Sequence, residues 1–403
     1  MRMDRRTLLQ GLAGASTLGI AGCMDIISGS SGPDNDASLW HARAEGPKAE
    51  LNDNVDQYND ESEVDIAASH IADLEDKVTS NIPAGDGPEA YQWAHDWVVK
   101  HHERGDLSDQ SDQIDVDLGQ FTDAAANAVQ TEDAVVGLPV NAETVGLIYN
   151  RNLVDEPPET VPEMVEIMDE FQNQDENRYG LSYPLDAYFI SAWAHAFGGY
   201  YYDQEGDELG ITMDETVEGF QYIIDTFVPY MPSDYENDPQ AAAFADGNAP
   251  FAINGPWFLG TVADKDFDVG VAPLPSPEGG EPKPFTGIKM WYFTPRMEED
   301  EERAEAARNF VEWYATNEDI AMERAEQQAA IPVLNSVAER DDLPENVDGY
   351  AAAVEQGQRM PNTPHMDKVW EPTENAFFNA LNGETELRGA LEDAAETIRD
   401  DWE

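Results

Sequence analysis

The stretch VVGLPVNAETVGLIY at residues 135–149 decides the fold class. It contains two short apolar runs, at 135–139 and 145–149, which we interpret as buried strands that follow each other closely in the chain. On both sides of this stretch, short apolar runs alternate with helical patterns, an order that is typical of α/β architecture. The sequence therefore predicts an α/β fold.

Upstream of this stretch, strands and helices are expected in turn. Apolar runs predict strands at 38–40, 64–67 and 90–94. A helical pattern follows each of the first two strands, at 47–58 and at 71–82. This half of the chain therefore reads as a series of strand–helix units.

Downstream, helical patterns dominate. Apolar residues at positions 217, 220, 224 and 227 are spaced i, i+3, i+7 and i+10, which places them on one face of a helix. The same spacing recurs within 307–314 and 387–398, and two buried strands are expected at 251–253 and 269–271. No internal repeat is visible.

The chain is strongly acidic. Its 403 residues include 83 Asp and Glu against 22 Lys and Arg, a formal net charge of −61. Such a surface repels a phosphate backbone, which argues against nucleic acid as a partner. With 41% hydrophobic and 10% aromatic residues the chain is also unlike a disordered protein. Its length suggests two or three domain-sized units.

The acidic residues are spread along the whole chain, and lysine is rare. At low ionic strength this charge destabilises the compact state, whereas at roughly 1 M salt the Debye length is about 3 Å and the repulsion is screened. We therefore expect a halophilic protein that unfolds when the salt is diluted. The alternative is an ordinary acidic secreted protein, whose circular dichroism would not depend on salt.

The N-terminus has the features of an export signal. The pair Arg5-Arg6 precedes an apolar, Ala- and Gly-rich stretch at 11–22, which is too short to span a bilayer. The arginine pair resembles a twin-arginine signal, which exports folded proteins. We therefore interpret 1–23 as a signal of this type.

The apolar stretch ends in Ile20-Ala21-Gly22-Cys23, which resembles a lipobox. Cys23 is the one cysteine of the chain, so an intramolecular disulfide is excluded. We expect lipid attachment at Cys23, with an inert buried thiol as the alternative, and a flexible tether at 24–36. The mature protein would then be anchored to the outer face of the cell membrane.

Five blocks of the remaining chain resemble the maltose/maltodextrin-binding proteins of ABC importers, a branch of the extracellular solute-binding proteins. The blocks occur in the order found in that family, and the resemblance covers roughly residues 38–398. They are residues 86–88 with 93–96, 138–143 with 147–151, 243–247 with 253–257, 283–287, and 360–366 with Trp370.

This resemblance implies a two-lobe, type II periplasmic-binding-protein-like fold with a ligand cleft between hinged lobes. One lobe would comprise 37–141 plus 285–338, and the other 143–282 plus 339–403. The implied function is non-enzymatic capture of a maltodextrin-type oligosaccharide by a monomer without a cofactor. The implied partners are a membrane permease and its ATPase subunits.

The matching positions carry residue types that suit a sugar, because aromatic rings cover the apolar faces of a pyranose and carboxylates accept hydrogen bonds from its hydroxyls. Charge-assisted hydrogen bonds of this kind contribute about 1.5–3 kcal/mol each. The residues that the resemblance assigns to the ligand are Trp93, Asp96, Glu143, Asp186, Tyr188, Phe189, Trp257, Met360 and Trp370.

The chain also departs from the family. The N-terminal segment 39–46 lacks the family's Asp-Lys pair, for which we consider Arg43 and Glu45 as substitutes. Trp97 stands where the family has an arginine after the acid, and a lysine-bearing helix is replaced at 72–75. Trp291 is an additional aromatic candidate for the cleft. These changes leave the identity of the sugar open.

Other interpretations carry less weight. His101 and His102 are adjacent on an expected helix and point about 100° apart, so they do not converge on a metal. The acidic run at 106–117 lacks the glycine and final glutamate of a calcium loop, and we interpret it as solvated. Paired carboxylates with aromatic platforms also occur in glycoside hydrolases, with Glu143 and Asp186 as the candidate pair. A third possibility is the same fold with a non-sugar ligand such as a polycation.

Overall fold

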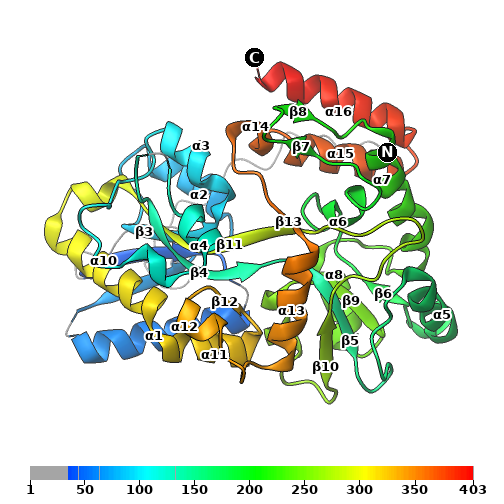
Figure 1. The fold of residues 1–403 in the computed structure, drawn as a ribbon, viewed down its shortest axis with the longest axis horizontal. Helices are drawn as coiled ribbons and strands as arrows, with labels where there is room; N and C mark the ends of the chain where they lie inside the picture. Colours follow the sequence, from blue (N-terminus) through cyan, green and yellow to red (C-terminus); the bar gives the residue numbers. More distant parts are fainter. Residues whose placement is uncertain (1–34, 44, 63, 132, 403) are drawn as a thin grey trace, which may run out of the picture. The chain divides into compact units, whose positions relative to one another are not determined.

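The computed structural model describes residues 35–43, 45–62, 64–131 and 133–402, which belong to one compact unit. The arginine pair, Cys23 and most of the expected tether lie outside the described residues. The described strands form sheets of seven, four and two strands (Figure 1).

The seven-stranded sheet has the order β12-β4-β11-β3-β1-β2, with β13 paired to one end of β11. Strands β1, β2 and β3 are parallel, whereas β11 runs antiparallel to both β3 and β4. The strands are β1 (Ala37–His41), β2 (Ile66–His70), β3 (Ala90–Ala94), β4 (Gly137–Glu143), β11 (Phe285–Phe293), β12 (Ile331–Pro332) and β13 (Gln358–Arg359).

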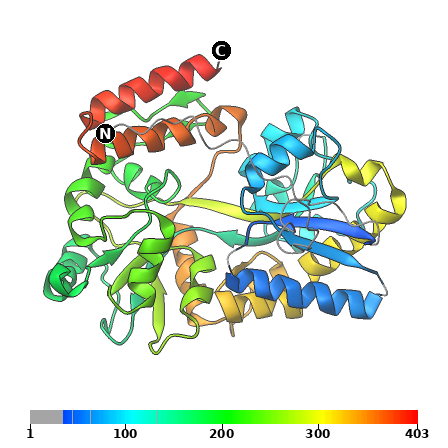
Figure 2. The same ribbon diagram turned by 180° about the vertical axis from the view of Figure 1, so that it is seen from behind.

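Both faces of this sheet are covered, as strand β11 shows. Met290 and Tyr292 pack into one apolar cluster, and the alternate residues Trp291 and Phe293 pack into another, because successive side chains of a strand point to opposite faces. Figure 2 shows α1 and α11 side by side below the sheet. The helices associated with this sheet are α1 (Glu45–Ser62), α2 (Leu74–Asn81), α3 (Val98–Glu103), α4 (Asp123–Ala128), α10 (Glu301–Thr316), α11 (Glu318–Gln328) and α12 (Asn335–Ala338).

The four-stranded sheet has the order β10-β5-β9-β6. Its strands are β5 (Gly146–Asn150), β6 (Leu181–Ser182), β9 (Phe251–Asn254) and β10 (Val269–Ala272), and a separate hairpin pairs β7 (Tyr202–Asp203) with β8 (Glu208–Leu209). The helices of this part are α5 (Val161–Phe171), α6 (Ser191–Ala194), α7 (Asp214–Thr226), α8 (Asn237–Ala245), α9 (Leu259–Val262), α13 (Glu345–Gln356), α14 (Pro364–Asp367), α15 (Trp370–Leu381) and α16 (Leu387–Trp402).

Local signals explain several helix boundaries. Helix α5 begins at a capping box, in which Thr160 and Glu163 each bond the other's backbone N–H. Asp300 and Asn317 accept backbone N–H bonds at the starts of α10 and α11. Short 3-10 helices complete the fold: η1 (His95–Trp97), η2 (Leu118–Gln120), η3 (Gln174–Glu176), η4 (Val228–Tyr230), η5 (Pro256–Phe258) and η6 (Pro295–Glu298).

The chain passes between the two larger sheets at the stretch with which the sequence analysis began. Strand β4 belongs to the seven-stranded sheet and β5 to the four-stranded sheet, and only Thr144 and Val145 separate them. The chain returns between β10 and β11. At the other end of β4, Gly137 is required, because a Cβ there would lie 2.0 Å from the carbonyl oxygen of Trp291. These passages bring the ends of β4 and β11 to the place where the two sheets meet.

The expected elements are present, with shifted boundaries. The strands predicted at 38–40, 90–94, 251–253 and 269–271 coincide with β1, β3, β9 and β10, whereas β2 begins two residues later than predicted. Helix α2 starts at Leu74 instead of residue 71. No described helix has the length and apolar character needed to cross a bilayer.

The acidic run at 106–117 was interpreted as solvated throughout, and this is wrong for its first member. Asp106 is buried, and its Oδ2 lies 3.0 Å from Nε of Arg104 and 3.2 Å from Nδ1 of His101. The paired cation offsets the cost of desolvating the carboxylate. Asp109, Asp112, Asp115 and Asp117 are exposed, as expected.

Among the described residues, no cluster of His, Cys, Asp and Glu is suited to hold a metal.

Candidate ligand-binding cleft

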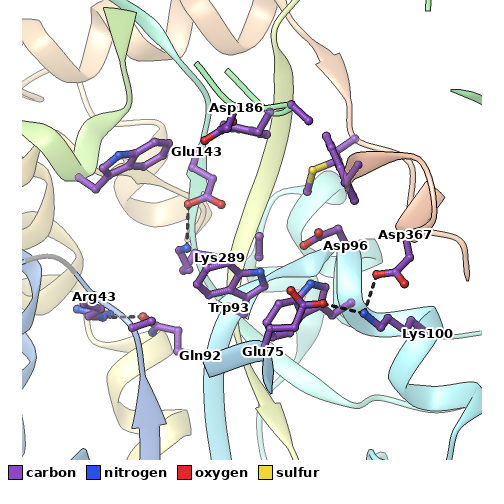
Figure 3. A pocket seen from close by; sticks show the side chains of 18 of the residues that line it. Arg43, Glu75, Gln92, Trp93, Asp96, Lys100, Glu143, Asp186, Lys289 and Asp367 are labelled. Carbon is purple, nitrogen blue, oxygen red and sulfur yellow. Dashed lines mark hydrogen bonds and ion pairs between the residues drawn. The ribbon is translucent and has the colours of Figure 1, made fainter. Parts of the chain in front are cut away.

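A cavity of about 1010 Å³ opens where the ends of β3, β4 and β11 face η5 and helices α14 and α15. Five aromatic residues line it, together with nine acidic and six basic ones (Figure 3). The aromatic residues are Trp93, Trp97, Tyr188, Trp257 and Trp370. The cavity is large enough for an elongated ligand, since drug-sized sites span about 300–1,000 Å³.

One wall presents aromatic rings. Tyr188 and Trp257 lie with their ring centroids 6.4 Å apart in a tilted arrangement, and Phe189 packs edge-on against Trp257 at 6.2 Å. Trp370, at the start of α15, is held by a T-shaped contact with Phe285 at 5.5 Å. Within the described residues, no ring stacks in parallel on Trp257 or Trp370 and no cation lies over either. Their half-buried faces are therefore available to a flat apolar surface.

The opposite wall uses its tryptophan differently. Trp93, near the end of β3, stacks on Trp97 with centroids 4.9 Å apart. Nζ of Lys289 also lies 4.9 Å from the centroid of Trp93, a distance at which cation–π attraction operates. The indole of Trp93 is thus already engaged by a second ring and by a cation.

Lys289 and Glu143 form an ion pair at the middle of the cleft, where the two strands that link the sheets run side by side (Figure 3). Nζ of Lys289 lies 3.3 Å from Oε2 of Glu143, and the Glu143 side chain is only 9% exposed. Gly287 is the β11 partner of Glu143, and a Cβ there would lie 3.3 Å from Cγ of Glu143. The glycine leaves room for the carboxylate beside the strand.

Asp96, in the 3-10 turn after β3, is the most perturbed acid of the cleft. Burial, together with the negative charge of Glu143, raises the pKa of Asp96 to about 8. Its Oδ1 is buried and has no hydrogen-bond partner in the described protein. Near neutral pH this side chain is therefore a neutral acid with an open position for a polar ligand atom.

Asp186 lies across the cleft on the loop before α6. Burial is the main factor that raises its pKa to about 6, with a further contribution from the charge of Glu374. The backbone N–H of Phe189 donates to Oδ1 of Asp186 at 2.9 Å, which fixes the carboxylate beside Tyr188. At neutral pH Asp186 is mostly ionised and accepts hydrogen bonds.

Arg43 lines the cleft but its guanidinium is committed to the protein. It donates to Oε1 of Gln92 at 2.6 Å, to Oε2 of Glu50 at 2.7 Å and to the hydroxyl of Tyr314 at 2.7 Å. Burial lowers the pKa of Arg43, but the electrostatic interactions and hydrogen bonds of Arg43 with Tyr314 and Glu50 outweigh burial, so that the pKa is raised. Arg43 therefore shapes this end of the cleft by holding Gln92.

The combination of bare aromatic faces, carboxylates that accept hydrogen bonds and two groups that can donate them suits a polyhydroxylated ring compound. Comparison with known proteins agrees with this chemistry. The family model of the bacterial extracellular solute-binding proteins matches residues 54–352, about three quarters of the chain.

The chain belongs to this family of solute-binding proteins.

Individual relatives of this solute-binding protein are named for the sugars that they bind. It is 37% identical over 326 residues to a maltotriose-binding protein of Pyrococcus abyssi, covering 79% of this chain and 71% of the relative. It is 26% identical to the maltodextrin-binding protein MdxE of Bacillus subtilis, covering 79% of this chain and 78% of the relative. A solved structure of the Thermus thermophilus maltotriose-binding protein with maltotriose superposes with a TM-score of 0.83 at 25% identity. That superposition covers 91% of this chain and all of the other, so the expected periplasmic-binding-protein fold is confirmed.

The cleft of this solute-binding protein brings together most of the residues that the sequence assigned to the ligand. Those that line it are Arg43, Trp93, Asp96, Glu143, Asp186, Tyr188, Trp257, Met360 and Trp370. Met360 is almost completely buried and forms part of the floor near Gly287. Contact of these residues with a ligand stays a prediction.

Two other candidates do not line the cleft, and the side chain of a third is not described. Trp291 is fully buried in the apolar cluster beneath the seven-stranded sheet, because it alternates along β11 with residues of the other face and packs edge-on against Tyr314 at 6.2 Å. The proposal that it faces the cleft is therefore wrong. Phe189 is buried behind Trp257 and supports that ring. Glu45 begins α1, and its side chain lies outside the described part of the chain.

Sequence reasoning missed the three lysines that line the cleft, Lys100, Lys289 and Lys368, of which Lys289 lies over the ring of Trp93 and Lys100 over that of Trp97. The sequence contained a signal for Lys289. It lies two residues after Gly287, the last residue of the family-like block 283–287, and residues i and i+2 of a strand lie on the same face. No such signal exists for Lys100, whose partner Asp367 is distant in the sequence.

Proposed function

We propose that this protein is the substrate-binding component of an ABC importer and captures maltooligosaccharides of about the size of maltotriose. The observation that supports this most directly is the wall formed by Tyr188, Trp257 and Trp370, opposite acids that face the same cavity. The named relatives bind maltotriose and maltodextrin, and a hydrolase is disfavoured because the family consists of binding proteins. The ligand is released unchanged to the transporter.

Each kind of residue makes a different kind of contact with the sugar. Trp257, Trp370 and Tyr188 stack on the apolar faces of consecutive sugar rings. Glu143 and Asp186 accept hydrogen bonds from hydroxyls. Lys289 donates to a sugar oxygen, and so does Asp96 in its neutral form. Both donors stand on the wall where Trp93 is stacked on Trp97 and lies beneath Lys289, so the two walls contact different parts of the sugar.

Closure of the cleft is the proposed signal to the transporter. The two lobes, 37–141 plus 285–338 and 143–282 plus 339–403, would rotate about the strands that link the sheets. A ligand that contacts both walls binds the closed form more tightly than the open form and shifts the equilibrium by that difference. A membrane permease then accepts the sugar from the closed form, while its ATPase subunits supply the energy.

The test is calorimetric titration of the purified protein with maltotriose in molar salt, together with small-angle scattering. Saturable binding and a smaller radius of gyration are expected. Spermidine serves as the probe for a polycation site, and release of glucose from maltotriose as the probe for hydrolysis. Binding of spermidine without binding of any maltooligosaccharide, or catalytic release of glucose, would overturn the proposal.

We also propose that the mature protein is anchored outside the cell through a lipid on Cys23 after twin-arginine export. This agrees with the extracellular family and with a relative from Streptococcus pneumoniae described as a solute-binding lipoprotein. Cys23→Ser should move the protein from the detergent phase to the aqueous phase in a Triton X-114 partition, and Arg5→Lys with Arg6→Lys should reduce export. Partitioning that Cys23→Ser leaves unchanged would contradict the anchor.

The acid surplus supports a third proposal, that the protein is halophilic. Circular dichroism should show loss of structure on dilution from molar salt to millimolar buffer, because self-repulsion is then unscreened. A spectrum that is the same in both would argue for an ordinary acidic secreted protein.

A further inference from the structure

Lys100 is held between two carboxylates at one end of the cleft. Its Nζ lies 2.6 Å from Oδ1 of Asp367 and 2.9 Å from Oε1 of Glu75 (Figure 3). The side chains of Lys100 and Asp367 are 14% and 19% exposed. Burial lowers the pKa of Lys100, but the hydrogen bonds that Lys100 donates to Asp367 and Glu75 have the larger effect and raise it. Lys100 therefore stays charged at neutral pH.

The bridge joins the two walls of the cleft. Lys100 and Glu75 lie on α3 and α2, beside the seven-stranded sheet, whereas Asp367 ends α14, three residues before Trp370 of the aromatic wall. A second polar contact accompanies it, in which the backbone N–H of Val99 donates to Oδ1 of Asn362 at 3.2 Å. Arg43 and Gln92 mark the other side of the cleft in Figure 3, away from this bridge.

The cavity does not end at the bridge. Its lining continues to Thr79, one helical turn beyond Glu75 on α2, and to Arg104, which caps α3 one turn beyond Lys100. Asp401, near the end of α16, lines the same cavity. The lining of the cavity thus extends along α2 and α3 past the residues of the bridge.

We propose that the bridge of Glu75, Lys100 and Asp367 is a length gate. It separates the sugar-binding part of the cleft from the part lined by Thr79 and Arg104, so that short maltooligosaccharides fit behind it and longer ones must break it. This proposal rests on the proposed function and adds to it a determinant of ligand length. None of the three residues was assigned to the ligand by the sequence.

The experiment compares the dissociation constants of maltotriose and maltoheptaose for four proteins in molar salt. Lys100→Met removes the cation that bridges Glu75 and Asp367, so the two carboxylates repel each other and the walls separate at this end. Asp367→Asn weakens the bridge while keeping the shape of the side chain. Lys265→Met is the matched control, since Nζ of Lys265 lies 3.8 Å from Oδ1 of Asp246, its side chain is 36% exposed, and neither residue lines the cavity.

In both gate variants the affinity for maltoheptaose relative to maltotriose should rise about tenfold, or about 1.4 kcal/mol. The control should keep the ratio of the parent protein within about twofold, as expected for an exposed pair. Thermal unfolding confirms that each variant is folded. A ratio that stays constant in either folded gate variant would overturn the gate, even where both affinities fall together. Failure of the parent protein to bind any maltooligosaccharide would overturn the proposed function and, with it, the gate.

Discussion

The two walls of the cleft use the same side chain for different purposes. On the wall beside the four-stranded sheet, Trp257 and Trp370 are braced by edge-on contacts, which leave ring surface toward the cavity. On the wall beside the seven-stranded sheet, Trp93 is engaged by Trp97 and by Lys289, each 4.9 Å from its ring centroid.

The difference shows that a tryptophan in a binding cleft is not by itself a sugar platform. A braced ring offers its face to the ligand, whereas a ring that already carries a cation offers that cation instead. We therefore expect the first wall to supply apolar contact and the second to supply directed hydrogen bonds. Four predictions test this division, in order of decreasing effect.

Trp257→Ala and Trp370→Ala should each weaken maltotriose binding by about 1–3 kcal/mol, a range borrowed from base–aromatic stacking. The loss comes from the ring surface that would cover a pyranose face. Calorimetric titration measures it. Trp313→Ala is the matched control, because Trp313 is also half-buried but packs against Tyr58 and Phe310 outside the cleft. An equal loss of affinity in the control would assign the effect to stability.

Lys289→Met should weaken maltotriose binding by about 1–2 kcal/mol, since it removes a charged donor and leaves Glu143 without its cation. Lys265→Met, which removes a lysine only 3.8 Å from the exposed Asp246, should have no measurable effect. Binding that is unchanged in Lys289→Met would show that the second wall does not contact the sugar through this cation.

Asp96→Asn should change the pH dependence of stability. The folded-state pKa of Asp96, about 8, lies above its ordinary value of 3.8, so the parent protein takes up a proton on folding between these pH values. Its stability therefore falls as pH rises through this window, with Glu143, Lys289 and Glu75 as the charged neighbours that face the carboxyl.

The asparagine variant lacks this titration. Relative to the parent, it should be more stable at pH 8 than at pH 5 by on the order of 1–2 kcal/mol, allowing for the part of Asp96 that stays accessible. Denaturant unfolding at both pH values in molar salt gives the difference. Parallel pH profiles for the two proteins would mean that Asp96 is ionised in the folded state.

Trp93→Phe should have the smallest effect, less than about 1 kcal/mol on maltotriose binding, because a phenyl ring still lies beneath Lys289. The loss should also be coupled to that cation: the double variant with Lys289→Met should lose less than the sum of the single losses. Additive losses, or a loss as large as that of Trp257→Ala, would make Trp93 a sugar platform and remove the distinction between the walls.

Several site residues were predictable because they follow local motifs. Trp257 and Glu143 belong to motifs that resemble those of the family, and in the structure Trp257 lies in the turn directly after strand β9 and Glu143 ends β4. Trp291 was not predictable in this way. It lies two residues after the cleft residue Lys289, in the part of β11 (residues 290–293) whose alternate side chains pack into two different cores, and the sequence pattern alone does not show where the strand leaves the cleft.

Arg43 shows a different limit. Its position in the N-terminal segment was right for the cleft, but the fold supplies Glu50, Gln92 and Tyr314 as partners, and Tyr314 is 271 residues away. A guanidinium satisfied by such distant groups is not free for a ligand. Partners of this kind are set by the packing of helices onto the sheet.

The sequence by itself determined the α/β class, the order of the elements and the acidic surface, and its resemblance to a family pointed to nine of the residues that line the cleft. The first three features depend on periodicity and composition, and the last on short motifs, all of which act over a few residues. Only the tertiary structure decided that Lys289 lies over Trp93, that Lys100 connects two walls through Asp367 and that Trp291 is core. Each of these facts depends on contacts between segments far apart in the chain, and side-chain roles in a cleft are fixed by such contacts.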